Sequence, residues 1–218
     1  MDLDIYKKRL KKANQSDALL YNSIKQVNNS FDNSPNFYNI TINGLDYNVH
    51  INSLKGEKKE LLLRPDTTLQ KGSIADIHGE NWIVTEFKPN KIYPKAVIDF
   101  CNQSLKWKRD DVTFEYPCFV SKSKNYRFKE TNTYMDMSEA DIEVYTQYNS
   151  DTDYIHESQR FLFNGKSFEV VGVDNFSQVY KDDGILIISL QRASSSELDD
   201  GSTNTAGDGN SSGWEGGW

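Results

Sequence analysis

Residues 72–87 read GSIADIHGENWIVTEF, and this stretch decides the fold. Ile74 and Ile77 lead into a turn of four residues, HGEN, after which Trp82 and Val84 alternate with their neighbours at the period of a strand. Gly79 tolerates the positive φ that a tight hairpin turn requires. The stretch therefore predicts a β-hairpin with an aromatic residue just beyond its turn.

A similar pattern returns at residues 159–174, QRFLFNGKSFEVVGVD, where Asn164-Gly165 marks the turn. After a polar connection each hairpin is followed by a closing apolar strand, KAVIDFCNQSLKW (95–107) in the first case and GILIISLQR (184–192) in the second. The shared order predicts an internal repeat, two small tandem β-barrels or sandwiches. The alternative is that any two β-hairpins look alike.

Further strands are expected before each of these hairpins. FYNITING (37–44) ends in the strong turn signal Asn43-Gly44, and YNVHI (47–51) and LLLRPD (61–66) follow it. VTFEYPCFVS (112–121) and ADIEVYTQY (140–148) come before the second hairpin. We therefore expect a first β unit over residues 37–111 and a second over residues 112–193.

The N-terminal arm, residues 1–36, is expected to be helical over residues 2–28. Apolar residues recur there every three or four positions, and Ser16 and Asp17 are suited to cap a second helix after a break near Asn14. The basic run KKRLKK (7–12) lies around the polar face and is either a solvated helix surface or a contact for an acidic partner. NSFDNSPN (29–36) is expected to be a loop.

Residues 194–218 predict a disordered acidic tail, because a Ser/Gly/Asp/Asn-rich stretch buries too little apolar surface to offset the entropy of ordering. The tail carries five acidic residues and no Lys or Arg, so of the net charge of −7 only about −2 remains for the rest of the chain. The tail ends in GWEGGW, whose Trp214 and Trp218 are either a short docking motif or two exposed side chains. The fold class we predict is mainly β, with an N-terminal helix, two β units and this tail.

Composition excludes several classes of function. A nearly neutral body argues against general nucleic-acid binding, and no run of 18 apolar residues is present to span a membrane. Cys101 and Cys118 are too few for a disulfide framework, and without a secretory leader we expect buried free thiols. Lys122, Lys124, Tyr126, Arg127, Phe128 and Lys129 form the one basic stretch interleaved with aromatics, and they leave an oligonucleotide-binding barrel as a lesser alternative.

Catalytic chemistry has little support in the sequence. The three histidines are widely spaced, and no nucleophile elbow, zinc-binding helix or phosphate loop occurs. The best candidate for a metal is the alternation of Asn149, Asp151 and Asp153, which a solvated loop also explains. We therefore expect no enzyme, no catalytic residues, no cofactor and no metal.

Residues 61–108 resemble virion structural proteins encoded near portal and capsid genes in siphophages and prophages of low-GC Gram-positive bacteria. The features that carry the resemblance are Leu63-Arg64-Pro65-Asp66, the hairpin with Gly72, Gly79 and Trp82-Ile83-Val84, and the strand end with Cys101-Asn102 and Leu105-Lys106-Trp107. MDLDIYKKRL and GILIISLQR also resemble that family, so the similarity spans most of residues 1–192. The hairpin is similar to that of head-closure or stopper proteins, although this chain is longer than a single-barrel stopper.

The resemblance implies a head–tail connector of the phage neck. Such a protein forms a homo-oligomeric ring between the portal or adaptor and the tail terminator or tail proteins, and helps to retain packaged DNA, which passes without sequence-specific binding. It is assembled in the host cytoplasm and located in the virion. The alternative is a receptor- or carbohydrate-binding or decorating β module on the virion, which predicts clustered aromatics at one end of a sandwich. We predict these partner-docking residues: Tyr6, Lys7, Arg9, Leu10, Arg64, Trp214 and Trp218.

Overall fold

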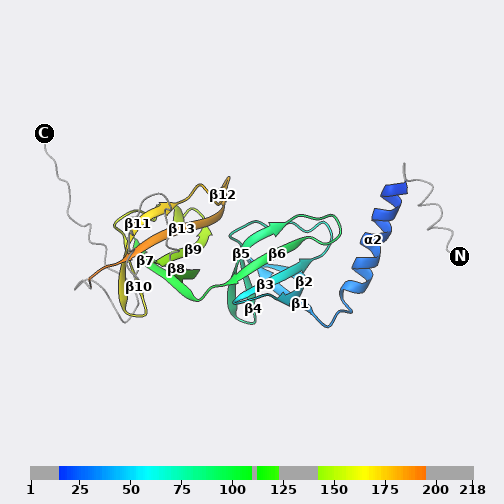
Figure 1. Cartoon of the computed structure of the whole chain (residues 1–218), viewed down its shortest axis with the longest axis horizontal. Coiled ribbons are helices and arrows are strands. Elements are labelled where there is room, and N and C mark those ends of the chain that lie inside the picture. The colour runs from blue at the N-terminus through cyan, green and yellow to red at the C-terminus, as the bar shows by residue number, and fades with distance from the viewer. Residues whose placement is uncertain (1–14, 110–111, 123–141, 195–218) are drawn as a thin grey trace, which may run out of the picture.

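A computed structural model describes residues 15–109, 112–122 and 142–194. These residues form helix α2 and two β units in a row, with α2 at one end and the last strand, β13, running toward the other (Figure 1). The predicted class, mainly β with an N-terminal helix and two barrel-like sheets, is confirmed.

Helix α2 spans Gln15–Phe31. Leu20, Ile24, Val27 and Phe31 recur at helical spacing, and the last two of them are buried. The predicted second helix is thus confirmed, but Ser16 and Asp17 lie inside it rather than at its cap, and its expected end at residue 28 is wrong. The helix continues to Phe31 because this side chain, only 2% exposed, packs against the first β unit and stabilises the last turn.

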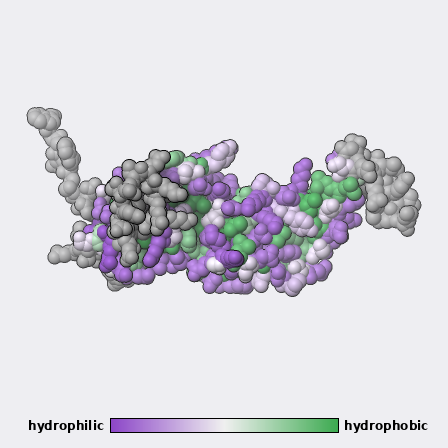
Figure 2. Space-filling view, viewed as in Figure 1, coloured by the Kyte–Doolittle hydropathy of each residue, from purple (hydrophilic) through white to green (hydrophobic). Residues whose placement is uncertain are grey.

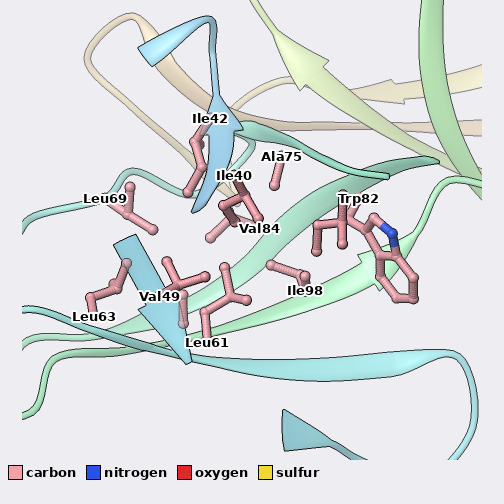
Figure 3. Close-up of a cluster of buried hydrophobic side chains, with 12 residues drawn as sticks. Ile40, Ile42, Val49, Leu61, Leu63, Leu69, Ala75, Trp82, Val84 and Ile98 are labelled. Atoms are coloured by element: carbon pink, nitrogen blue, oxygen red, sulfur yellow. The ribbon is translucent and has the colours of Figure 1, made fainter. Parts of the chain in front are cut away.

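The first β unit is a closed barrel of antiparallel strands in the order β1-β2-β3-β6-β5-β4. Its strands are β1 (Phe37–Ile42), β2 (Leu45–Ser53), β3 (Lys58–Leu63), β4 (Ile74–Ile77), β5 (Glu80–Lys88) and β6 (Lys95–Phe100). Strand β1 closes the barrel by pairing Ile42 with Ala75 of β4. Alternate residues point inward and fill the barrel, and Figure 3 shows them converging from every side: Ile40, Ile42, Val49, Leu61, Leu63, Leu69, Ala75, Trp82, Val84 and Ile98.

The second β unit has the strand order β10-β11-β13-β9-β8-β7, with the short β12 paired to β13. Its elements are β7 (Gln103–Arg109), β8 (Val112–Lys122), β9 (Ile142–Tyr148), the 3₁₀ turn η1 (Thr152–Tyr154), β10 (Arg160–Phe163), β11 (Lys166–Asp174), β12 (Val179–Tyr180) and β13 (Asp183–Arg192). A separate core lies inside it, formed by Leu105, Trp107, Cys118, Val144, Ile155, Phe161, Phe163, Phe168, Val170, Leu186, Ile188 and Leu190.

The boundary between the units corrects our expectation. We placed it after residue 111 and took residues 95–107 as one strand, but β6 ends at Phe100 in the first barrel and β7 begins at Gln103 in the second sheet. Only Cys101 and Asn102 connect the two strands. Alternation of apolar residues continues across this point, so the pattern alone does not reveal that the pairing partner changes.

The internal repeat is confirmed, and it extends to the whole topology. Strands β1 to β6 of the first unit match β7, β8, β9, β10, β11 and β13 of the second, in the same order around the sheet. Both predicted hairpins form, but the first turn is His78-Gly79 rather than the four residues 78–81 that we expected, because Glu80 already pairs with Ile77. The turn residues His78, Gly79, Asn164 and Gly165 all have positive φ.

Details of the hairpins repeat at the same offset. Each second strand shifts register at a bulge, between Val84 and Glu86 in β5 and between Val170 and Gly172 in β11. The carbonyl at the start of each bulge accepts a 2.8 Å hydrogen bond from the loop before the hairpin, donated by the Gly72 amide in one unit and the Ser158 amide in the other. The two units are therefore copies of one β design.

The units touch through few groups beside the connection. Lys71 Nζ donates to Gln178 Oε1 at 3.2 Å, and Gln147 Nε2 donates to Asn43 Oδ1 at 3.4 Å. At Gly72 the backbones come so close that an added Cβ would lie 1.7 Å from the carbonyl oxygen of Gly184. Only glycine fits at residue 72.

No helix in the described residues is both long and apolar enough to cross a membrane.

Candidate docking surface

The C-terminal end of helix α2 is clamped to the first barrel. Phe31 stacks on the His50 ring with 4.0 Å between centroids, and it meets Phe37 edge to face at 6.3 Å. His50 Nε2 lies 2.8 Å from the Phe31 carbonyl oxygen, which only accepts, so this ring nitrogen carries the proton. The contact satisfies one of the carbonyls that the helix end leaves without an intrahelical partner.

Arg64 also contacts Phe31. Its guanidinium lies 4.8 Å from the centre of the Phe31 ring and forms an ion pair with Asp32. The Arg64 side chain is 28% exposed. We selected Arg64 as a partner-docking residue, but the structure engages it within the chain, where it orients α2.

The apolar side chains in the first turns of α2 are more exposed than Val27 and Phe31. Leu19 is 61% exposed, and Leu20 and Ile24 are half-buried although they continue the face that holds Val27 and Phe31. Figure 2 shows a hydrophobic area over this end of the chain. The reason is geometric: the clamp sits at the end of the helix, and the helix axis leads away from the barrel (Figure 1).

The remaining docking residues that we predicted fall outside the described part of the chain. They are Tyr6, Lys7, Arg9 and Leu10 before α2, and Trp214 and Trp218 after β13. Of the basic stretch that begins at Lys122, the structure describes only this lysine, and the other residues lie outside the described part of the chain.

A second cluster, which the sequence did not single out, surrounds Arg109 at the end of β7. Its guanidinium lies 4.1 Å from the Tyr154 ring centre and 5.0 Å from that of Phe114, and Nη2 is 3.9 Å from Asp151 Oδ1. Trp107 stacks on Phe114 at 5.3 Å and on Tyr116 at 5.5 Å. The aromatic positions of β7 and β8 were visible in the sequence, but their stacking depends on the register between these strands.

In the polar loop of residues 149–153, beside this cluster, side-chain oxygens accept hydrogen bonds from other groups of the chain. Tyr116 donates its hydroxyl hydrogen to Asp151 at 2.7 Å, and burial together with this carboxylate raises the pKa of Tyr116. Asn149 Oδ1 accepts from the amides of Asp151 and Thr152, and Asp153 accepts from Asn175. Within the described residues no group of three or more His, Cys, Asp or Glu side chains is placed to hold a metal ion.

Both cysteines are free thiols in or near the junction of the units. Burial, with a smaller contribution from Asp99, raises the pKa of Cys101 to about 12. Burial also raises the pKa of Cys118, which lies in the second core. A raised pKa removes the thiolate that a nucleophile requires at neutral pH.

Comparison with known proteins divides the chain at the same place as the sheets do. Residues 6–100 match the YomX N-terminal domain, and residues 103–191 match the YomX C-terminal domain. No curated protein matches the chain. Among solved structures, the crystal structure of the ATP-binding sugar transporter-like protein from Salmonella typhimurium aligns at 16% identity over 40% of this chain and 99% of that one. Its TM-score of 0.31 is too low to support an argument about fold or function.

Proposed function

Because the chain contains both YomX domains in order and so belongs to this phage-like family, named for a Bacillus prophage protein, we propose that it is a structural protein of the virion neck. In this role it forms a ring between the portal or adaptor and the tail, and helps to retain the packaged DNA. Its action is assembly rather than turnover, and it needs no cofactor. It is assembled in the host cytoplasm and acts in the virion.

The observation that carries the proposal is the clamped helix at one end of a row formed by a closed barrel and a barrel-like sheet. Arg64 and His50 hold only the end of α2, so the apolar residues of its first turns are presented to a neighbour. An elongated chain with different surfaces at its two ends makes heterologous contacts, and such contacts close a ring when they repeat around an axis.

The net charge of the first barrel is compatible with a channel through which DNA moves without binding. Residues 37–100 contain eight Lys or Arg and eight Asp or Glu, so this barrel is electrically balanced. Phosphate binding requires an excess of basic groups, because release of counterions drives it. A balanced barrel offers DNA no strong electrostatic attraction, which favours sliding over binding.

The test is immunogold electron microscopy of intact virions with an antibody raised against residues 37–192. Label at the head–tail junction is the expected result. Pre-immune serum on the same grids is the matched control. Label confined to the tail tip or to the capsid surface contradicts the neck assignment, and absence of label from well-penetrated particles contradicts a place in the virion.

The cluster around Arg109 favours one second candidate, a receptor- or carbohydrate-binding module on the virion. Tyr154 is 65% exposed there, and exposed aromatic rings are platforms on which sugars stack. Phe114 and Tyr116, however, both stack on the buried Trp107, and Tyr154 is the most exposed of these four rings. Tail-tip label in the same experiment supports this candidate.

A further inference from the structure

Helix α2 and strand β13 lie at opposite ends of the described chain (Figure 1). We propose that residues 195–218 of one copy bind the apolar face of α2 in a second copy. This proposal deepens the ring assembly described above and rests on it. It names the contact that joins neighbouring subunits.

The receiving surface consists of Leu19, Leu20 and Ile24. Leu19 projects 61% of its surface to solvent, and the other two are half-buried on the face that continues toward Val27. Leu20 and Ile24 lie on the face that continues to Val27, and Leu19 lies at its edge. Apolar side chains that are this exposed among the described residues are typical of a surface that a partner occupies.

Charge complementarity identifies the occupant. Residues 1–14, which lead into α2, carry five basic side chains in the run 7–12 and two acidic ones, Asp2 and Asp4. Residues 195–218 carry five acidic side chains and no basic one. Residues 130–159 also lack Lys and Arg, but β9 (Ile142–Tyr148) and η1 (Thr152–Tyr154) belong to the second β unit, whereas residues 195–218 follow the last strand. Opposite charges steer two such segments together and fix their direction.

The same acidic segment supplies apolar anchors. Trp82 and Trp107 are buried in the two cores. Trp214 and Trp218, by contrast, occur in a segment whose one other large apolar residue is Leu198. Tryptophan is the residue type most enriched among side chains that dominate the energy of interfaces. Anchors of this kind match a helix face made of leucine and isoleucine.

A second copy is favoured over the same chain by the position of the two ends. Strand β13 runs toward the end of the row opposite to α2 (Figure 1), so a contact from the residues after it to helix α2 of the next subunit joins unlike ends. Residues 195–218 span at most roughly 80 Å when extended, which allows either arrangement in principle. The experiment therefore has to distinguish them.

Photo-crosslinking identifies the contact directly. Leu19 is replaced by p-benzoylphenylalanine in the full-length protein, unlabelled and ¹⁵N-labelled chains are mixed before irradiation, and the linked peptides are found by mass spectrometry. We expect links from position 19 to residues 195–218 that join one light and one heavy chain. The same photo-reactive residue at Phe176, which is 77% exposed on the second unit, is the control and should not label this segment.

Interface variants measure the contribution of the contact by sedimentation velocity. Trp214→Ala with Trp218→Ala should weaken self-association by roughly tenfold or more, as loss of buried aromatic anchors does. Leu19→Glu should do the same without unfolding the chain, because the side chain is exposed, whereas Phe176→Glu should leave assembly unchanged. Raising the salt concentration should weaken association, since it screens the charged segments.

Three results overturn the proposal, and they separate it from the ring itself. Links within single chains only show that the segment folds back on its own helix. Assembly that persists after both tryptophans are replaced, with links from position 19 to a barrel, keeps the ring and rejects this contact. A chain that stays monomeric at virion-like concentrations rejects both the contact and the ring.

Discussion

The close approach of Gly72 to Gly184 leads to a prediction about how the two β units are held together. Gly72→Ala places a methyl group 1.7 Å from the carbonyl oxygen of Gly184, where ordinary contact begins at about 3.4 Å. The loops must therefore separate by a comparable distance. Gly79→Ala is the matched control, because its φ of +83° is nearly that of Gly72, +82°, and a Cβ there meets nothing within 4 Å.

The magnitude follows from two contributions. Alanine in the left-handed region costs about 1–2 kcal/mol, and both variants pay it. Gly72→Ala also separates Lys71 from Gln178 and Asn43 from Gln147, two exposed hydrogen bonds that contribute about 0.5–1 kcal/mol each. We expect Gly72→Ala to lie about 1–2 kcal/mol below Gly79→Ala in free energy of unfolding.

Denaturant unfolding followed by circular dichroism checks the difference in stability, and small-angle scattering checks the shape. Gly72→Ala should shift the midpoint below that of the control and broaden or split the transition, because the two cores unfold less cooperatively once the loops part. The scattering curve should also change. Equal midpoints and equal scattering for the two variants would refute the reasoning, since they would show that the loops absorb the methyl group without separating.

Other consequences of the structure are testable in the same protein. Arg64→Ala removes both the ion pair to Asp32 and the guanidinium over Phe31. The free energy of local opening in residues 15–31, measured by hydrogen exchange, should therefore fall by about 1–2 kcal/mol. Lys88→Ala breaks only an exposed ion pair and should leave this opening free energy unchanged. Deleting residues 195–218 should shift the Tm of the β units by no more than about 1 °C, because both cores are complete without them; a larger fall would show that this segment packs on a barrel. The folded-state pKa of Cys101 is raised to about 12, so the unfolded chain releases this proton first and stability should fall as pH rises above the ordinary thiol value of about 8.5 toward 12. Cys101→Ala should make the loss of stability between pH 8 and 10 shallower than in the parent chain, and an identical slope would contradict the assigned burial.

The hairpins and the repeat followed from the sequence, because their determinants are local. A two-residue turn with positive φ at both positions selects Asn-Gly or a similar pair, and the strand that follows alternates at a period of two. His78-Gly79 and Asn164-Gly165 supply such turns, and both form. The helix before the first barrel was likewise visible in its apolar spacing.

The boundary between the units and the role of Arg64 depended on the tertiary structure. Strands β6 and β7 form one continuous alternating stretch, and only the choice of pairing partners assigns them to different sheets. Arg64 stands in a loop-like Arg-Pro-Asp sequence that suggests an exposed side chain, yet the fold brings it to Asp32 and Phe31, more than thirty positions earlier. Contacts of this kind join distant residues, so no local pattern encodes them.

The candidate site shows the same division. Composition alone marked both ends of the chain as unlike the rest, one basic and one acidic with two tryptophans, because net charge and residue type need no coordinates. That Leu20 is only half-buried while Phe31, on the same helix face, is buried was decided by where the barrel meets the helix. Periodicity predicts that a helix has an apolar face, but the packing of the folded chain decides which part of that face is left for a partner.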